Sequence, residues 1–290
     1  MPVLGVLLAV AVAASPPGSN REHGARPSPP ALGCPLATAE AAPVPAATSY
    51  ASLAEALRAV LAGQPRVLAV GELHQTKATA RVPSALARFT REMLAPLREA
   101  GATDLVVETW ITTGACGEVE EKAVAQVEKT TERPARTENE VLTLLKQAKQ
   151  AGILPRILQV ACQDYRAMMG GSQIDFDRVL RLTRDQLEAQ IRAALARPGS
   201  RMVVSYGGAL HNDLQPTQEL GPYSFGPAVS SLVGGRYVEL DLYVPEYVDQ
   251  NAALRKEPWW GAYRGAYRRG QVTLVRRGDS SYALIFPRAR

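Results

Sequence analysis

Short, continuous apolar runs alternate along the chain with stretches in which apolar residues recur at helical spacing. The helical stretches lie at 52–63, 83–101, 137–152 and 183–199. A short apolar run that is typical of a buried strand lies at 66–70, and further strands are expected at 103–109, 156–162, 201–206 and 236–244. This alternation predicts an α/β fold with a mostly parallel central sheet and helices on both faces.

Local signals refine the limits of these elements. Thr137 and Thr183 each stand three residues before a Glu or Gln, which is the spacing of a helix capping box. Pro96 predicts a kink near the end of its helix. The last apolar stretch, 271–286, predicts a C-terminal β-hairpin. The polar segment 113–136 predicts a short helix and a surface loop.

The first 49 residues have a different character. Residues 3–14 form an apolar run that is too short to span a bilayer and is followed by small residues, so we expect a signal peptide over 1–14. Residues 15–49 are rich in Pro, Ala, Gly and Ser, which predicts a disordered leader. The expected protein is exported, either periplasmic, outer-membrane or secreted, with a single α/β domain over 50–290.

Cysteine usage adds two expectations. Cys34 ends the string "ALGC", which is similar to a bacterial lipobox and predicts lipidation with membrane anchoring; the alternative is a free thiol in the leader. A lipidated Cys34 leaves Cys116 and Cys162, which we expect to form a disulfide. Sequence alone does not show whether their Cα atoms are close enough to pair.

Composition narrows the classes of partner. The chain is 46% hydrophobic, which is enough for a substantial core, and its net charge is +5. The basic residues are scattered and no nucleic-acid recognition motif accompanies them, so we expect no nucleic-acid binding. A small-molecule or peptide substrate is the expected partner.

Two of the three histidines stand in the same setting. "GELH" at 71–74 and "GALH" at 208–211 each follow an apolar run. Because the carboxyl ends of parallel strands share one edge of a sheet, Glu72, His74, Glu108 and His211 are expected to line one crevice as catalytic residues. His74, His211 and Glu108 are also the expected ligands of a divalent metal. The alternative is direct acid–base chemistry on water.

Other residues near the strand ends are weaker candidates. Gly71 and Gly208 permit tight turns and close approach of a ligand to the backbone. Asp164 follows the third strand, and Asp213 follows the second histidine motif. Each has a structural alternative, since a histidine can be a hydrogen-bonded core residue and Asp164 a turn residue.

Three patches resemble a known superfamily. They are "VLAVGELHQTKATARVP", "ATDLVVET" and "VVSYGGALHND". They are similar to the superfamily that joins ChaN-type haem-binding lipoproteins, Tiki/TraB proteases and erythromycin esterases. The resemblance implies an α/β fold with paired G-x-x-H motifs in which Glu72, His74, Glu108 and His211 match the family's site. It also implies a basic residue near the first motif, for which the candidates are Arg81 and Arg88.

The branches of this superfamily imply different functions. A Tiki-like chain would be a metal-dependent hydrolase, whereas erythromycin esterases activate water with a histidine and no metal. A ChaN-like chain would bind haem through a tyrosine at a homodimer interface. Such a platform could come from four aromatic residues that lie beside Arg264, namely Trp259, Trp260, Tyr263 and Tyr267. An inactive scaffold is the third alternative. Of these, the sequence favours a hydrolase of the protease or esterase class.

Overall fold

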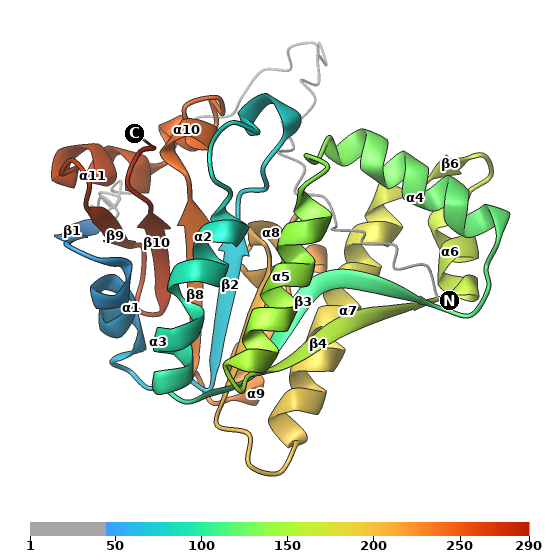
Figure 1. Cartoon of the computed structure of the whole chain (residues 1–290), viewed down its shortest axis with the longest axis horizontal. Helices are drawn as coiled ribbons and strands as arrows, with labels where there is room; N and C mark the ends of the chain where they lie inside the picture. The colour runs from blue at the N-terminus through green and yellow to red at the C-terminus, as the bar shows by residue number, and fades with distance from the viewer. Residues whose placement is uncertain (1–44, 290) are drawn as a thin grey trace, which may run out of the picture.

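The computed structural model describes residues 45–289 of the chain (Figure 1). The expected signal peptide, the leader up to residue 44 and Cys34 lie outside the described residues, so export and lipidation stay predictions. Within 45–289, eight strands form one sheet in the order β1-β9-β10-β8-β2-β7-β3-β4. Their bounds are β1 (Ala46–Tyr50), β2 (Val67–Glu72), β3 (Ala102–Thr113), β4 (Leu154–Ala161), β7 (Met202–Gly208), β8 (Tyr237–Tyr243), β9 (Val272–Arg276) and β10 (Ser281–Ile285).

The sheet is parallel from β10 to β4, and the first two strands of the order, β1 and β9, are joined to it by antiparallel pairs, β1 with β9 and β9 with β10. The expected α/β fold with a mostly parallel sheet and a C-terminal hairpin is therefore confirmed. The two strands that carry the histidine motifs, β2 and β7, are direct neighbours. Gly71 pairs with Gly207, and Glu72 pairs with Gly208.

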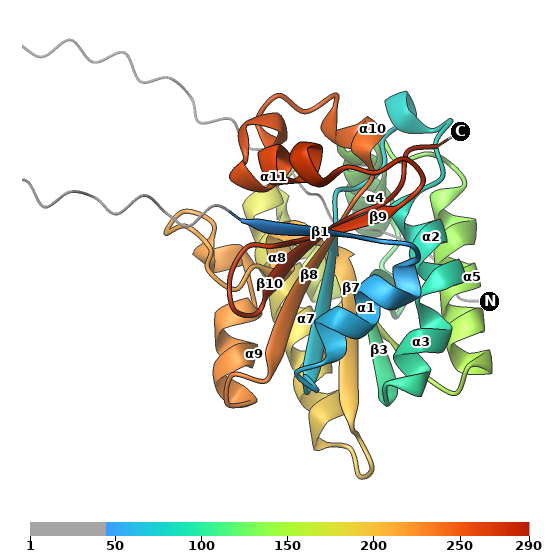
Figure 2. The same cartoon turned by 90° about the vertical axis from the view of Figure 1, so that its left-hand side faces the viewer.

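Helices cover both faces of this sheet (Figures 1 and 2). Successive side chains of a strand point to opposite faces, so Leu68 and Val70 of β2 join one core while Val67 and Ala69 join another. The helices over the first core are α1 (Leu53–Leu61), α2 (Ala85–Glu92), α3 (Leu94–Glu99) and α5 (Thr137–Gln150). Those that pack on the second are α4 (Glu118–Thr131), α6 (Cys162–Met168), α7 (Phe176–Ala196) and α9 (Gly226–Leu232).

Shorter elements complete the described part of the chain. They are α8 (Ala209–Asn212), α10 (Pro245–Val248), α11 (Pro258–Ala266), the 3-10 helices η1 (Lys77–Thr79), η2 (Gly221–Tyr223) and η3 (Leu254–Lys256), and a small hairpin of β5 (Met169–Gly170) and β6 (Gln173–Ile174). Over 45–289, no helix has the length and apolar character needed to cross a membrane.

The helix expected over 83–101 is two helices, α2 and α3, which meet at Met93. Pro96 causes the break, but it acts one turn earlier than the sequence pattern indicated. Its ring clashes with the carbonyl of the residue four positions before it, Glu92, to which it also donates no N–H. Both helices still bury their apolar stripe, with Phe89 and Leu97 fully buried.

The starts of two helices also differ from the capping boxes expected. The N-cap of α5 is Arg136, and Thr137 is its first helical residue. The N-cap of α7 is Asp175, so the helix begins well before Thr183. Thr183 is buried inside the helix, where its hydroxyl donates to the carbonyl of Val179 at 2.9 Å. Such a bond to the preceding turn satisfies the hydroxyl without a cap.

Two segments were misjudged from their composition. Residues 46–49, assigned to the leader, form β1 together with Tyr50, and they pair with β9 along its whole length. The polar segment that follows β3 carries α4, which has 14 residues and is longer than the short helix expected. Neither segment contains an apolar run. β1 is held by a sheet edge that another strand provides, and α4 buries only Ala123 and Val127, so neither element needs such a run.

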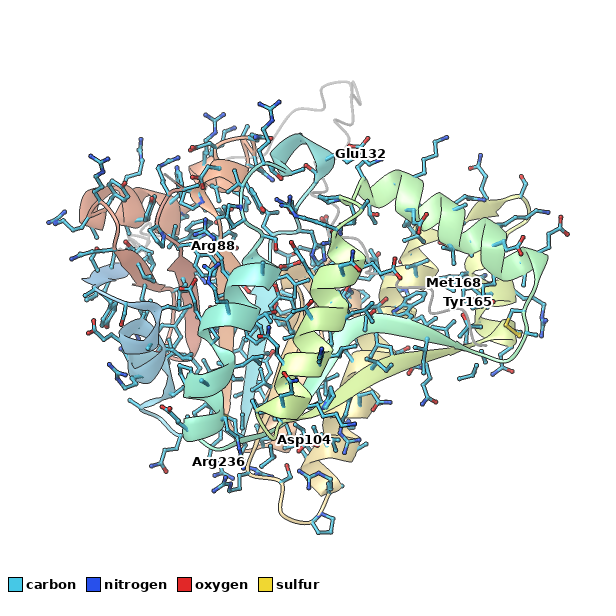
Figure 3. The ribbon with its side chains drawn as sticks, in the orientation of Figure 1. Arg88, Asp104, Glu132, Tyr165, Met168 and Arg236 are labelled. Carbon is cyan, nitrogen blue, oxygen red and sulfur yellow. A yellow bond between two sulfur atoms is a disulfide. The ribbon has the colours of Figure 1, made fainter. Side chains whose placement is uncertain are left out.

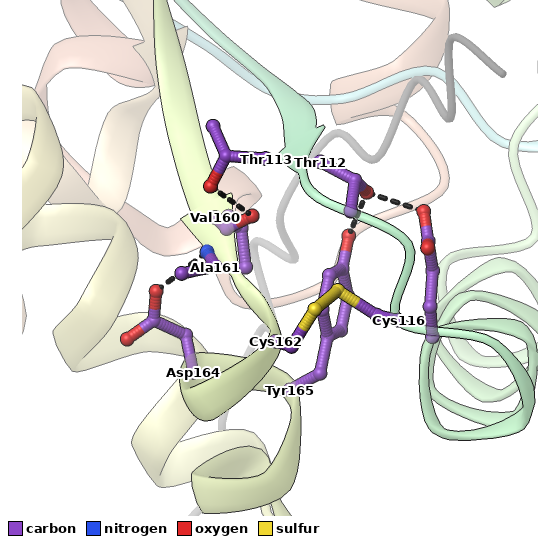
Figure 4. The surroundings of a disulfide bond; sticks show 9 residues. Thr112, Thr113, Cys116, Val160, Ala161, Cys162, Asp164 and Tyr165 are labelled. Atoms are coloured by element: carbon purple, nitrogen blue, oxygen red, sulfur yellow. Dashed lines mark hydrogen bonds between the residues drawn. A yellow bond between two sulfur atoms is a disulfide. The ribbon is translucent and has the colours of Figure 1, made fainter. Parts of the chain in front are cut away.

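Cys116 and Cys162 form a disulfide, with their Cα atoms 5.0 Å apart (Figure 4). Cys116 follows β3 and Cys162 opens α6 directly after β4, and these two strands are paired. Next to the bridge, the hydroxyls of Thr112 and Tyr165 lie 2.9 Å apart. The disulfide therefore ties the segment that begins α4 to the start of α6.

Loss of this bridge should lower stability substantially. The two cysteines are separated by 46 positions, and closing a loop of that size removes enough entropy from the unfolded chain to stabilise the fold by about 4 kcal/mol. We expect the Cys116→Ser/Cys162→Ser variant to lose a free energy of unfolding of this order in urea titrations under non-reducing conditions. Equal midpoints and slopes for the variant and the wild type would show that the bridge does not form in solution.

Candidate functional site

A group of buried polar side chains gathers around the carboxyl ends of β2 and β7 and the middle of β3, and we name it the central cluster. In Figure 3, Glu132, the residue before the cluster member Arg133, is labelled in the upper part of the molecule, whereas Asp104 and Arg236 are labelled in the lower part. The cluster draws on three strands, a loop after β2, the loop between α4 and α5, and α8. Its members are Glu72, His74, Glu108, Arg133, Tyr206 and His211.

Glu72 lies at the centre of the cluster, and the residue is 2% exposed. Its Oε1 lies 2.6 Å from Nδ1 of His74 and 3.5 Å from Nη1 of Arg133, and its Oε2 accepts the hydroxyl of Tyr206. Burial would raise the pKa of Glu72, but the bond from His74, the charges of His74 and Arg133 and the bond from Tyr206 outweigh it, so its pKa lies below the ordinary value. Glu72 is therefore an ionised carboxylate.

His74 is oriented by that carboxylate. A carboxylate can only accept a hydrogen bond, so Nδ1 of His74 carries a proton, and Nε2 is the nitrogen that bears the lone pair in the neutral tautomer of the ring. Among the described residues, this Nε2 is buried and has no hydrogen-bond partner. It points at the backbone of β7, where a Cβ added to Gly208 would lie 2.8 Å from it. The ring is thus held in place with one nitrogen available.

The glycines of both motifs serve close packing of the protein and not tight turns. Gly71 and Gly208 both lie in strands, and neither has a positive φ. A Cβ at Gly71 would lie 2.4 Å from Oδ1 of Asp241, and one at Gly207 would lie 2.3 Å from Oε2 of Glu108. The expectation of turns at these positions is wrong, whereas close approach to the backbone is observed for neighbouring side chains.

Glu108 is fully buried. The sequence placed it at the end of its strand, but β3 continues to Thr113. Glu108 follows Val107, which is the last residue of β3 that pairs with β7. The pairing of β3 with β4 also changes register between Val107 and Trp110. Its Oε2 accepts the N–H of Gly208 at 2.6 Å. Burial raises the pKa of Glu108, although the charge of His74 and the bond from Gly208 oppose this. The two carboxyl groups of the cluster thus have pKa values shifted in opposite directions.

His211 lies across from Glu108, with its Nε2 4.0 Å from Oε1 of that residue. Its Nδ1 donates to the carbonyl of Tyr223 at 2.7 Å, which leaves Nε2 as the unprotonated nitrogen. Burial lowers the pKa of His211 to about 4. The contact with Glu108 is therefore one between a neutral imidazole and a carboxyl group near pH 7. Within 45–289, neither Nε2 of His211 nor Oε1 of Glu108 has a hydrogen-bond partner.

The basic residue of the cluster is Arg133, which sequence reasoning missed. Arg81 is exposed, and Arg88 is buried elsewhere, where its Nη1 donates to the carbonyl of Pro287 at 2.9 Å. Both are therefore wrong as the expected basic residue. Nothing in the string "ERPAR" marks Arg133, and Tyr206 reads as an ordinary residue of a buried strand. Only the folded chain brings these two side chains to Glu72.

The two remaining aspartates lie outside the cluster. Asp164 accepts the N–H of Ala161 at 2.8 Å and so caps the start of α6, as Figure 4 shows, which is its structural alternative. The carboxylate of Asp213 accepts the N–H of Gln215 at 2.8 Å. Asp213 lines a separate cavity of about 540 Å³ together with Asp241 and Trp259. Neither aspartate contributes to the central cluster.

The three expected metal ligands, His74, Glu108 and His211, each have one buried polar atom without a hydrogen-bond partner within 45–289. Across the described residues, no three or more His, Cys, Asp or Glu side chains are grouped as ligands of a metal. The guanidinium of Arg133 supplies positive charge to Glu72 and Glu108. Metal binding by His74, Glu108 and His211 stays a prediction.

The aromatic segment proposed as a haem platform is mostly buried. Trp259, Trp260 and Tyr263 are each less than 5% exposed, and they pack with β9 and β10 in a third apolar cluster. The rings of Trp260 and Tyr263 are stacked, with centroids 4.7 Å apart. The structural alternative, in which these residues pack over the sheet edge, describes this segment, and haem binding stays a prediction.

Comparisons with known proteins add little to this geometry. No family model matches the chain, and no curated protein matches it. Among solved structures, the chain is similar to one described as "The structure of the type III effector HopBA1", with 14% identity and a TM-score of 0.39, over 70% of this chain and 88% of that one. A likeness this low carries no argument about function.

The depressed pKa of His211 should appear in the pH dependence of stability. The unfolded chain binds a proton at this residue with a pKa near 6.5, and the folded chain with a pKa of about 4. Between these values the unfolded state holds more protons, so the free energy of unfolding falls as pH is lowered, by up to about 3 kcal/mol.

A His211→Gln variant lacks this titration. We expect the difference in unfolding free energy between wild type and variant to shrink from about pH 7 to about pH 4.5, as measured by urea titration at each pH. A difference that does not change with pH would contradict the assigned burial of a neutral imidazole.

Proposed function

We propose that this protein is a hydrolase that activates water with His74 and protonates the leaving group with Glu108, without a metal. The observation that carries the proposal is the pair formed by Glu72 and His74, in which a buried carboxylate holds the imidazole and leaves Nε2 unpaired among the described residues. A base oriented by a third group is the arrangement that general-base catalysis requires.

The base is His74. Its Nε2 lone pair takes a proton from a water molecule, and the hydroxide so formed attacks the electrophilic carbon of the substrate. The resulting imidazolium is stabilised by the ionised carboxylate of Glu72 at 2.6 Å. Tyr206 and Arg133 help to keep Glu72 ionised, because their hydrogen bonds and charge lower its pKa.

The acid is Glu108. Its raised pKa favours the protonated carboxyl group, and its Oε2 is occupied by the N–H of Gly208, so the proton belongs on Oε1. From there it passes to the leaving group, and the imidazolium of His74 returns a proton to Glu108 to close the cycle. Two carboxyl groups with pKa values pushed apart by their surroundings are the usual sign of separate charge-stabilising and proton-donating roles.

Support for hydrolysis, as opposed to another acid–base reaction, comes from the resemblance of the two motifs to the superfamily that includes Tiki/TraB proteases and erythromycin esterases. The pairing of His74 with the carboxylate of Glu72 favours the esterase-like alternative, in which a histidine activates water, over the Tiki-like one. The substrate class proposed is therefore an ester, lactone or amide whose carbonyl carbon can approach Nε2 of His74.

Removal of the base should abolish turnover. We expect His74→Asn and Glu72→Gln each to lower kcat by about 10²- to 10⁴-fold on whichever ester or peptide of a substrate panel the wild type hydrolyses. Glu92→Gln, which neutralises a carboxylate on the surface of α2, is the matched control and should leave kcat unchanged. Full activity in His74→Asn would contradict the proposal.

Two further experiments separate this chemistry from metal catalysis and from loss of folding. Gly208→Ala keeps every ionisable group but places a methyl group 2.8 Å from Nε2 of His74, so it should impair turnover while the protein remains folded. Dialysis against a strong chelator should leave kcat unchanged. Loss of activity on chelation, with recovery on adding a divalent ion, would instead favour a metal-dependent site.

A further inference from the structure

A large cavity adjoins the central cluster on the side of α4. It has a volume of about 630 Å³ and lies between η1, α4, the loop after α4 and the start of α5. Ligand pockets of drug-sized molecules have volumes in this range. Arg133 lines this cavity and also contacts the cluster, since its Nη1 lies 3.5 Å from Oε1 of Glu72. Arg133 therefore links the cavity to the candidate catalytic residues.

The guanidinium of Arg133 has unused capacity to bind an anion. Its side chain is 12% exposed, and its contact with Glu72 is the longest that this carboxylate makes. Nη2 of Arg133 is buried and has no hydrogen-bond partner anywhere in 45–289. A buried N–H group without an acceptor costs about 1–3 kcal/mol, so an acceptor supplied by a ligand would be favoured.

The backbone on both sides of Arg133 is held by hydrogen bonds. Glu132 is the C-cap of α4 and has a φ of 47°, the left-handed conformation in which helices commonly end. Its N–H donates to Glu128 and its carbonyl accepts from Lys77 at 2.9 Å. On the other side, Arg136 donates to Oε1 of Gln75 at 2.7 Å and to the carbonyl of Val82.

The other walls of the cavity fit an organic anion better than a bare ion. Apolar side chains contribute to the lining, among them Val127 and Pro134, and two cationic residues, Lys77 and Lys129, also belong to it. Two acidic residues, Glu128 and Glu138, balance these lysines, so the remaining cation of the lining is Arg133, which Glu72 contacts from the side of the central cluster at 3.5 Å. An apolar body with one anionic end matches this distribution.

We propose that this cavity binds the anionic end of the substrate, with the guanidinium of Arg133 holding a carboxylate or phosphoryl group. The proposal rests on the function proposed above, because it places the scissile bond of the same molecule beside His74. Arg is suited to this role, since its planar fork donates two parallel hydrogen bonds to the oxygens of such groups. The substrate class becomes an ester or amide that carries a negative charge near the bond that is cleaved.

The test is binding of small aromatic probes to the full chain, measured by calorimetry. Benzoate and phenyl phosphate carry the two kinds of anionic end, and benzamide is the neutral counterpart of benzoate. We expect the wild type to bind an anionic probe at least about tenfold more tightly than benzamide. The tighter of the two anionic probes identifies the group that the subsite prefers. Equal affinities for benzoate, phenyl phosphate and benzamide, or no binding of any of them, would overturn the proposal.

Variants of Arg133 assign the binding to this cavity. Arg133→Gln should weaken binding of the anionic probe by about tenfold or more, and Arg133→Lys, which keeps the charge but loses the fork, should have an intermediate effect. Arg192→Gln, on the exposed face of α7, is the matched control. Unchanged binding in a folded Arg133→Gln would overturn the proposal. If this variant does not fold, Arg133→Lys and the comparison of probes in the wild type decide the matter.

His74→Asn separates this proposal from the proposed function. It should retain wild-type affinity for the anionic probe, because His74 does not line the cavity, while it loses turnover. Anion binding that depends on Arg133, together with hydrolysis that does not depend on His74, would contradict the proposed function but not the subsite. Hydrolysis that depends on His74, together with anion binding that does not depend on Arg133, would contradict the subsite alone.

Discussion

The burial of the carboxylate of Glu72 is the constraint on which the rest of the site depends. A charge removed from water must be compensated by hydrogen bonds and opposite charge, or the group takes up a proton. Here the compensation comes from three residues. His74 and Arg133 contact Oε1 of Glu72, and Tyr206 donates to its Oε2. The same bonds that keep Glu72 ionised therefore orient the imidazole and hold the guanidinium beside it.

This arrangement needs positions in β2 and β7 that carry no side chain. Gly71 and Gly207 are paired across β2 and β7, and Gly208 lies opposite Glu72. Any Cβ at these glycines would overlap Asp241, Glu108 or His74. The glycines thus make room for polar side chains at a place where a parallel sheet normally packs apolar ones. As a result, the site reaches into the sheet and is not confined to the loops above it.

Much of the fold follows from local pattern. Buried strands such as β2 and β7 contain continuous apolar runs because both faces of a parallel sheet are covered, and amphipathic helices such as α5 show one apolar stripe. The elements that the pattern missed are held by partners from elsewhere. β1 depends on an edge that β9 provides. The break at Met93 depends on the backbone around Pro96, which apolar spacing does not report.

The sequence by itself determined the parts of the site whose members are close along the chain or stand at strand ends. Glu72 and His74 are two residues apart, and His211 follows a matching motif. Tertiary structure alone decided that β2 and β7 are neighbours, that Glu108 lies inside β3, and that Arg133 reaches Glu72 from 61 positions away. The physical reason is that a local pattern records only which face of an element is buried. The choice of polar partner depends on long-range packing and on the need to compensate a buried charge, which no short stretch of sequence encodes.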